Sequence, residues 1–198
     1  MSRARTGERR EIILQTLARM LEERHGERIS TAQLADAVGV SEAALYRHFS
    51  GKARMFEALL EFIEESLFTR ITKILAEESD LGRRLQSILL LTLGFAEKNR
   101  GMARLLYGDI LVGETERLRR RAAQIYDRLE TQLKQIIREA QAHNGRRIAV
   151  NETASLLASL IEGRIARYAR SDFRLKPTAD WEQQWALLAR ALFDEKPA

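Results

Sequence analysis

The sequence predicts an all-α protein, and three observations support this class. Only 2 of the 198 residues are proline, and both lie late, at Pro177 and Pro197, so the strongest helix breaker is absent from residues 1–176. An all-β sandwich or barrel needs more Gly- and Pro-rich turns than 11 glycines and 2 prolines can supply. The lack of cysteine excludes a disulfide scaffold and cysteine-based zinc or iron–sulfur sites.

Apolar residues recur every three or four positions through most of the chain, which predicts amphipathic helices. The first helix is expected over residues 8–24, and Gly26 is the signal that ends it. A break at Gly51 precedes a set of mostly longer helices, so we expect two domains, residues 1–51 and 52–198. The longer set is expected over the segment that carries Met55 to Ile71 and at 81–98, 102–107, 114–142, 152–172 and 181–193.

Residues 31–50 have the pattern of a helix-turn-helix. Ala35 is the small residue where two short helices cross, and Gly39, four positions on, provides the left-handed turn between them. The expected caps are Ser30, paired with Gln33 in a capping box, and Ser41 before a helix over 42–48. The apolar contacts are expected from Leu34, Val38, Val40 and Leu45. An ordinary pair of short core helices is the alternative explanation.

The position of the charges favours DNA over that alternative. A net charge of +5, mostly from arginine, fits a GC-rich genome as well as phosphate recognition, so the total does not decide. The first ten residues form a basic arm of Arg3, Arg5, Arg9 and Arg10, opposed only by Glu8. The second short helix adds Tyr46, Arg47, His48 and then Lys52. Groups of this kind contact phosphates, so the pattern predicts a DNA-binding domain.

The stretch from Thr31 to Phe49, followed by Lys52 and Phe56, closely resembles the DNA-binding domain of TetR-type regulators. The shared pattern Ile/Leu-Ala-x-x-x-Gly-Val-Ser-x-x-x-Leu-Tyr-x-His-Phe, then Lys, is complete here. The resemblance implies nine helices and a homodimer whose last two long helices form a four-helix bundle. The residues expected at DNA are Arg9, Ser30, Thr31, Ser41, Ala43, Tyr46, Arg47, His48 and Lys52. Those expected at the dimer interface are Leu156, Leu160, Ile165, Trp185 and Leu188.

Similarity to one subgroup of the family, the nucleoid occlusion factors, continues beyond this domain. It includes Arg54-Met55-Phe56, Glu61-Phe62-Ile63-Glu64, Thr69-Arg70-Ile71, Leu93-Gly94-Phe95 and Arg170-Ser171-x-Phe173. The resemblance implies a protein that, when bound to DNA, antagonises polymerisation of the tubulin-like division protein FtsZ. It also implies that the acidic-apolar tail of FtsZ binds between the fourth and fifth helices, at Phe62, Arg70, Leu91, Gly94, Lys98 and Asn99. Lys98 stands where the subgroup has arginine, and Arg100 where proline is common.

Periodicity alone gives a different interpretation of these groove residues and leaves a second function open. It places Phe62 and Leu91 in the core and leaves Arg70 and Lys98 solvated. An apolar floor flanked by these cations would nevertheless suit an acidic peptide with apolar anchors. The alternative function is a ligand-responsive TetR-type repressor of an efflux or metabolic gene. It needs a small-molecule cavity, against which the bulky run at residues 88–93 argues.

No residue pattern indicates catalysis or a cofactor. His25, His48 and His143 are far apart, and no glycine-rich phosphate loop is present, so we expect no enzyme, metal or cofactor. The arginine-rich stretch at residues 117–121 is expected to be a solvated helix face, although it could bind anions. The arginines of residues 164–174 form one stripe that could border the dimer bundle and pair with acidic residues across it, or remain exposed. The longest apolar run, 88–96, is far shorter than the roughly 20 residues of a membrane span, and residues 1–10 lack the apolar part of a signal peptide. We therefore expect a cytoplasmic, nucleoid-associated protein.

Overall fold

Helices make up most of the chain that the computed structural model describes, residues 2–23, 29–111, 116–144 and 148–193. The expectations for Gly26 and His25 fall outside these residues, as do the side chains of Arg3, Arg5 and His143. The described part contains nine α-helices and no strand, so the predicted all-α class is confirmed. The helices are α1 (Ser2–Glu23), α2 (Thr31–Val38), α3 (Glu42–His48), α4 (Lys52–Glu77), α5 (Leu81–Lys98), α6 (Arg100–Tyr107), α7 (Glu116–Asn144), α8 (Val150–Arg170) and α9 (Trp181–Phe193), with a 3-10 turn η1 at Asp109–Leu111.

The helix ends agree with the prediction where the sequence carries a strong local signal. α3, α5 and α9 begin and end at the residues expected. α8 ends at Arg170 and not at 172, because Asp172 and Phe173 have left-handed φ values of 49° and 62°, which no helix can continue. The other differences are starts at Ser2 for α1, Arg100 for α6, Glu116 for α7 and Val150 for α8, and an end at Asn144 and not at 142 for α7.

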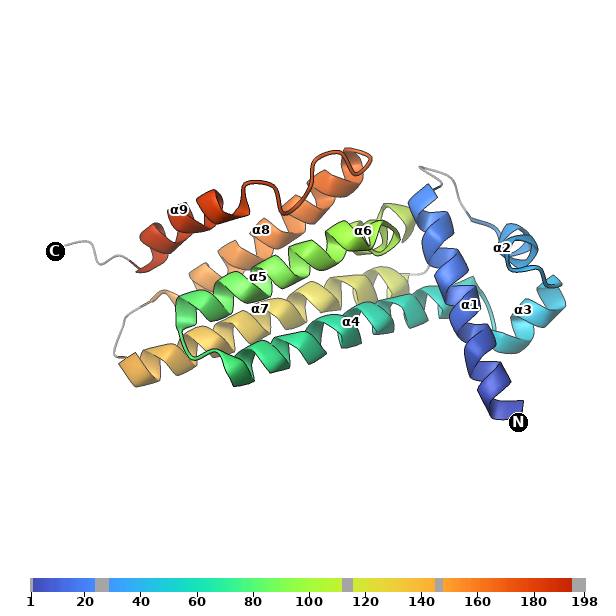
Figure 1. Cartoon of the computed structure of the whole chain (residues 1–198), viewed down its shortest axis with the longest axis horizontal. Coiled ribbons are helices and arrows are strands. Elements are labelled where there is room, and N and C mark those ends of the chain that lie inside the picture. The colour runs from blue at the N-terminus through green and yellow to red at the C-terminus, as the bar shows by residue number, and fades with distance from the viewer. Residues whose placement is uncertain (1, 24–28, 112–115, 145–147, 194–198) are drawn as a thin grey trace.

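The helices form an elongated body with the short helices at one end (Figure 1). α4, α5, α7 and α8 run along the long axis, while α1, α2 and α3 occupy the end at the right of the view. α6 lies at the junction, where it contacts α1, α4, α5, α7 and α8. α9 packs against α5 toward the end of the body that lies away from α1–α3 (Figure 1). The short helices are thus joined to the body through α4 and through the contact of α1 with α6.

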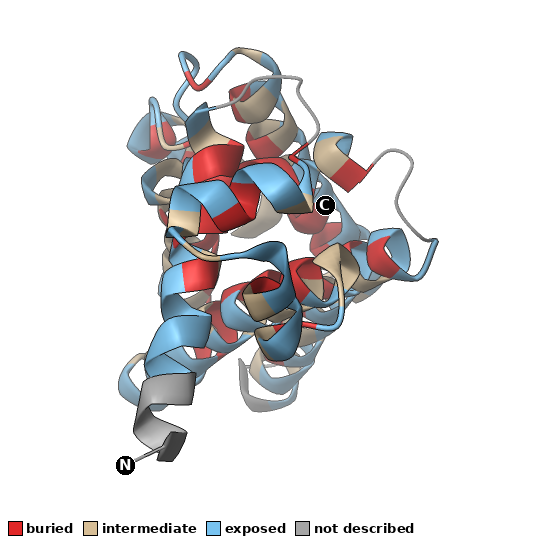
Figure 2. Cartoon of the chain, turned by 90° about the vertical axis from the view of Figure 1, so that its right-hand side faces the viewer, coloured by how far each residue is buried: buried red, intermediate tan, exposed pale blue. Residues whose placement is uncertain are grey.

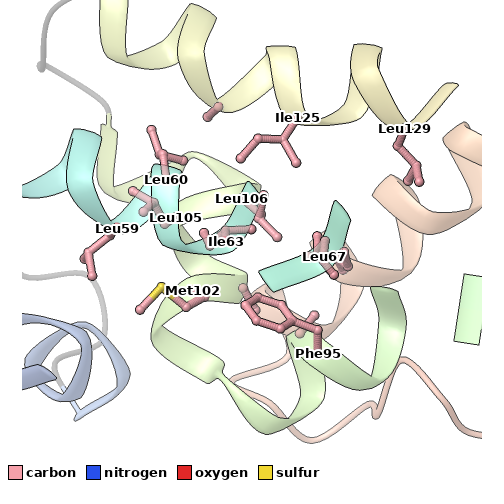
Figure 3. Close-up of a cluster of buried hydrophobic side chains, with 14 of the residues drawn as sticks. Leu59, Leu60, Ile63, Leu67, Phe95, Met102, Leu105, Leu106, Ile125 and Leu129 are labelled. Atoms are coloured by element: carbon pink, nitrogen blue, oxygen red, sulfur yellow. The ribbon is translucent and has the colours of Figure 1, made fainter. Parts of the chain in front are cut away.

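One continuous apolar core connects the two ends of the molecule. In its middle, Leu60 and Ile63 of α4 meet Phe95 of α5, Leu105 of α6 and Ile125 of α7 (Figure 3). Full burial of each such side chain contributes roughly 1.5–3 kcal/mol. Figure 2, which looks at the end with α1–α3, shows buried residues inside and exposed residues on the outward faces. The orientation of the short helices is therefore set by the same core that holds the body.

Candidate nucleic-acid interface and adjoining groove

The helix-turn-helix is built by the local signals that the sequence contains. Ser30 Oγ accepts a hydrogen bond from the backbone N of Gln33 at 3.1 Å, and Gln33 Oε1 accepts one from Ser30 N at 3.0 Å, so the predicted capping box is confirmed. Gly39 ends α2 with a left-handed φ of 74°, a conformation that strains any residue with a side chain. Ser41 then caps α3 by accepting from Ala44 N at 3.2 Å. Local sequence thus fixes the angle between α2 and α3.

Apolar and polar contacts hold α3 against α1. Leu34, Ala35 and Leu45 are buried, whereas Val38 and Val40 are half-buried. Arg10 Nη1 of α1 donates to the carbonyl O of His48 at 2.6 Å, and its guanidinium lies 4.1 Å from the ring centroid of Phe49. The sequence pattern assigned Arg10 only to the basic arm. Its spacing of three residues from the buried Ile13 is the signal that places it on the inner side of α1.

Most residues expected at DNA lie on the outer side of α2 and α3. Arg9, Ser30, Ser41, Ala43, Tyr46 and Arg47 are exposed, while Thr31, His48 and Lys52 are half-buried. Thr31 Oγ1 donates to Glu42 Oε2 at 2.8 Å and accepts from the hydroxyl of Tyr46 at 3.4 Å. Glu42, which the sequence pattern did not select, therefore belongs to this surface. An exposed short helix with hydroxyl, aromatic and guanidinium groups has the chemistry that reads a DNA major groove.

One of the expected DNA contacts, Lys52, is also anchored to the fold, and His48 is partly buried. Lys52 Nζ donates to the carbonyl O of Ile29 at 3.3 Å and lies 5.5 Å from the ring centroid of Phe56. The Nδ1 atom of His48 is buried and has no hydrogen-bond partner among the described residues. The Lys52 side chain is therefore oriented by the protein itself, which reduces the entropy lost when a ligand orders it.

A groove adjoins the helix-turn-helix where α4 meets the corner between α5 and α6. It has a volume of about 630 Å³, and Phe62, Lys98 and Asn99 line it. Phe62 is 49% exposed, and its ring centroid lies 6.5 Å from that of the buried Phe95. The periodicity-based expectation that Phe62 is a core residue is therefore wrong. The buried stripe of α4 runs through the neighbouring Leu59 and Ile63, and the described residues leave about half of the Phe62 side chain uncovered.

The other residues expected in the α4–α5 groove lie outside the lining of this 630 Å³ space. Arg70 is exposed on α4, and Leu91 and Gly94 are half-buried on α5. A Cβ placed on Gly94 would meet no atom within 4 Å, so no internal packing requires glycine at this position. Glycine in a helix interior costs about 0.5–1 kcal/mol relative to alanine. The open space at Gly94 is one that an incoming side chain could fill.

A second apolar surface lies on α8 and α9. Leu156 is 52% exposed and Leu187 67% exposed, while Leu160 and Leu188 are half-buried. Ile165 and Trp185, which were also expected at the interface, are buried in the core of the single chain. α8 packs against α5, α6 and α7 along one face, so only its opposite face is available to a partner. Leu187, which the pattern did not select, belongs to that available surface.

The two arginine-rich stretches are mostly paired within the protein. Arg117 lies 3.2 Å from Glu57, and Arg121 bonds Glu64 of α4, which Arg128 also contacts. Partial burial raises the pKa of Glu64, but the hydrogen bonds from these two arginines outweigh it and hold the pKa below the ordinary value. Arg164 donates to the carbonyl oxygens of Pro177 and Ala179, both at 2.6 Å, and so holds the turn between α8 and α9. These arginines position helices, which reduces the case for a second anion-binding surface.

Several other chemistries find no support in the described ranges. No three His, Cys, Asp or Glu side chains there are grouped as metal ligands. None of the helices described has the length and apolar character needed to cross a membrane. Buried apolar side chains lie among α4–α8, where a small-molecule cavity would be needed; examples are Ile88, Leu93, Leu105 and Leu157. The exposed surface of α3 and the groove at Phe62 are therefore the two surfaces at which we expect a ligand to bind.

Comparison with known proteins finds family matches for both the N-terminal and the C-terminal part of the chain. Residues 13–59 match the family described as bacterial regulatory proteins, tetR family, and residues 68–193 match the tetracyclin repressor-like C-terminal domain. The nucleoid occlusion factor SlmA of Marinomonas sp. (strain MWYL1) is 58% identical over 187 residues, which cover 93% of this chain and 95% of that protein. The SlmA protein of Shewanella pealeana is 54% identical over 186 residues, covering 93% and 94%.

Solved structures share the fold at low sequence identity. A TetR transcription regulator from Haloarcula marismortui has a TM-score of 0.79 at 21% identity, over 94% of this chain and 98% of that one. The fatty acid degradation regulator FadR from Bacillus halodurans has a TM-score of 0.75 at 14% identity, over 94% and 97%. These similarities show the architecture alone.

Proposed function

Because the chain belongs to the tetR family of bacterial regulatory proteins and, within it, to the group of the nucleoid occlusion factors, we propose that it is a DNA-binding nucleoid occlusion factor. In this proposal the DNA-bound protein antagonises FtsZ polymerisation and so blocks septum assembly over the chromosome. The proposal has two parts, DNA binding (the DNA half) and FtsZ binding (the partner half). The observation that supports the partner half is the exposure of the apolar Phe62 ring in a groove that also contains the cationic Lys98. A ring left exposed in this way loses the free energy of burial unless a partner covers it.

The DNA half of the proposal rests on α3. A homodimer would place two copies of α3 in successive major grooves of a DNA site with two-fold symmetry. Arg47 and Ala43 are assigned to reading bases, since a guanidinium suits guanine and a small apolar side chain suits the thymine methyl group. Tyr46 and Lys52 are assigned to positioning the protein on the phosphate backbone, with Arg9 on a flanking phosphate.

The dimer would form through the exposed face of α8 and α9. Leu156, Leu160, Leu187 and Leu188 are the apolar residues available there. Two copies of these helices related by a two-fold axis form a four-helix bundle that covers the four side chains. This arrangement sets the separation of the two recognition helices, so the proposed DNA binding depends on the dimer.

The partner half assigns the acidic-apolar tail of FtsZ to the groove. Phe62 and Leu91 would receive its apolar side chains, and Gly94 leaves room for them. Arg70 and Lys98 would pair with its carboxylates, although Lys98 acts as a point charge and cannot form the two parallel hydrogen bonds of an arginine. Asn99 Nδ2 donates to the carbonyl O of Phe95 at 2.8 Å, so its remaining amide oxygen can accept from the peptide backbone.

Sedimentation of FtsZ polymers with the protein and its DNA tests the proposal. The DNA site is first selected from random-sequence duplexes, and FtsZ is then polymerised with GTP and pelleted. We expect a reduced pellet only when protein and cognate DNA are both present. Phe62→Ala should restore the pellet without changing DNA affinity, because the ring lies outside the DNA surface.

The matched control is Leu175→Ala, since Leu175 is 47% exposed but lies on the turn between α8 and α9. This variant should act like the wild type. Intact polymers in the presence of DNA-bound wild-type protein would reject the division role and favour a TetR-type transcriptional repressor. Equal effects of the Phe62 and Leu175 variants would reject the assignment of the groove.

A further inference from the structure

The first residue of the recognition helix α3, Glu42, is an exposed carboxylate on a surface that otherwise suits a polyanion. The side chains of fixed charge that are assigned to DNA, Arg9, Arg47 and Lys52, are all cations. A carboxylate close to phosphate groups weakens the binding of any duplex, because like charges repel. The presence of Glu42 at this position therefore needs a physical reason that offsets the repulsion.

One such reason is local to the protein and accounts for half of the carboxylate. A negative charge in the first turn stabilises the helix dipole of α3, and Glu42 Oε2 accepts a hydrogen bond from Thr31 Oγ1 at 2.8 Å. The orphan backbone groups at this helix start are already served by Ser41, which accepts from Ala44 N. The second oxygen of Glu42, Oε1, makes no hydrogen bond to the part of the chain that the structure describes. One acceptor of the carboxylate is thus open toward the solvent side of α3.

A short chain of hydrogen bonds restrains the Glu42 carboxylate. Thr31 Oγ1 donates to Glu42 and accepts from the hydroxyl of Tyr46 at 3.4 Å, so three side chains are joined across the outer side of α2 and α3. Glu42 and Tyr46 are four residues apart and share one face of α3, next to the row of Ala43 and Arg47. A carboxylate held in this way loses less side-chain entropy on binding a ligand than a free one does.

The four bases differ in what they offer to a carboxylate in the major groove. Cytosine presents the N4 amino group, which donates a hydrogen bond, whereas guanine N7 and O6 and thymine O4 are acceptors that repel a negative oxygen. Adenine has the N6 amino group, but its own N7 acceptor lies beside it. A carboxylate only accepts, so it favours cytosine. The N-terminal residues of a recognition helix are those that reach the base edges, and Glu42 is the first of them.

We propose that Glu42 is a specificity-determining residue that reads a cytosine through Oε1, while Thr31 holds the carboxylate in position. This inference rests on the proposed DNA binding and adds a base contact to those assigned to Arg47 and Ala43. Because the proposed dimer has two-fold symmetry, each half-site contains one such cytosine at the symmetry-related position. The repulsion from phosphates then serves selectivity, since a duplex without this cytosine meets the negative charge with no hydrogen bond to offset it.

Selection from random-sequence duplexes, followed by competition binding with single-base variants of the selected site, tests this inference. For the wild type we expect one cytosine in each half-site whose replacement by thymine lowers affinity about tenfold. Glu42→Gln should move the preference at that position from cytosine to adenine, because an amide donates and accepts and so pairs with both N7 and N6. Glu42→Ala should bring the affinities for the four bases at that position to within about twofold of one another, with the other positions unchanged.

The matched control is Asp36→Asn, which removes an exposed carboxylate from α2 of the same domain and leaves α3 intact. It should keep the base preference at every position. If Glu42→Gln and Glu42→Ala raise the affinity for all duplexes by one common factor and keep the preference for cytosine, Glu42 acts only as a charge at the helix end, and the inference is overturned. If the wild type selects no sequence at all from the random duplexes, the DNA half of the proposed function itself fails.

Discussion

The junction of α1, α4, α5 and α6 has a tightly packed side, called the closed side, and a solvent-exposed side, called the open side. Different physical requirements explain the residues found on each. On the closed side, Gly101 packs under Ala18, and the buried Arg104 reaches Leu21. On the open side, Phe62 is half exposed, and Gly94 faces empty space. Packing explains the residues of the closed side. It does not explain the residues of the open side, which lower the stability of the isolated chain, so a binding partner is the physical reason we assign to them.

The largest effect is expected from Gly101→Ala, on the closed side. The added methyl group would overlap the backbone of α1, which cannot rotate away as a side chain can. We expect a loss of about 3 kcal/mol or more in the free energy of unfolding, measured by urea denaturation at a fixed protomer concentration. A value within about 0.5 kcal/mol of the wild type would mean that α1 shifts at little cost, and the two sides would then not differ.

Arg104→Met should have the next largest effect. It removes the donor to the Leu21 carbonyl and leaves Asp109, whose side chain is 35% exposed, without its ion-pair partner. Breaking a buried pair costs about 3–5 kcal/mol, and the partial exposure of Asp109 reduces the expected loss to about 2–3 kcal/mol. Circular-dichroism unfolding curves measure it. The double variant Arg104→Met with Asp109→Ala should recover part of the loss, and no recovery would show that the pair is not the cause.

Glu97, at the end of α5 beside this junction, gives a smaller effect that depends on pH. Partial burial raises the pKa of its carboxyl, but hydrogen bonds from Thr178 and Lys176 outweigh that and hold the pKa below the ordinary value of 4.5. The resulting stabilisation is present above that value and is lost as the pH falls through the folded-state pKa. Glu97→Gln should therefore cost about 1–1.5 kcal/mol near neutral pH, and the gap from the wild type should close on acidification.

Unfolding at several pH values checks this expectation. Glu65→Gln, which changes an exposed carboxylate on α4, is the control and should follow the wild type throughout. A gap for Glu97→Gln that stays constant into acid would show that the carboxylate's charge does not stabilise the turn between α8 and α9.

The sequence predicted the parts of this fold that depend on neighbours in the chain. Ser30, Gln33, Gly39 and Ser41 act within four residues of the groups they satisfy, so their roles could be predicted and are confirmed. Asp80, which accepts from the backbone N of Arg83, is a cap of the same local kind, although the sequence pattern did not select it. Residue spacing is sufficient in such cases because both partners belong to one turn.

The parts that could not be predicted depend on contacts between distant segments. Arg104 and Leu21 are 83 residues apart, and nothing in either segment indicates that they meet. The exposure of Phe62 depends on where α1 crosses α4, which periodicity does not describe. α8 has apolar residues on two faces, so the pattern alone could not tell the buried Ile165 from the exposed Leu156.

Gly94→Ala, on the open side, should have the smallest effect on stability and the opposite sign. No atom lies within 4 Å of the added methyl group, and alanine is favoured over glycine in a helix, so we expect a gain of about 0.5–1 kcal/mol. If the open space serves the FtsZ tail, the same methyl group should weaken peptide binding, measured by anisotropy with DNA present. Higher stability together with weaker binding would show that this glycine is kept for the partner. Higher stability with unchanged binding would remove Gly94 from the site and leave Phe62 as its centre, whereas lower stability would show that the open side is packed after all.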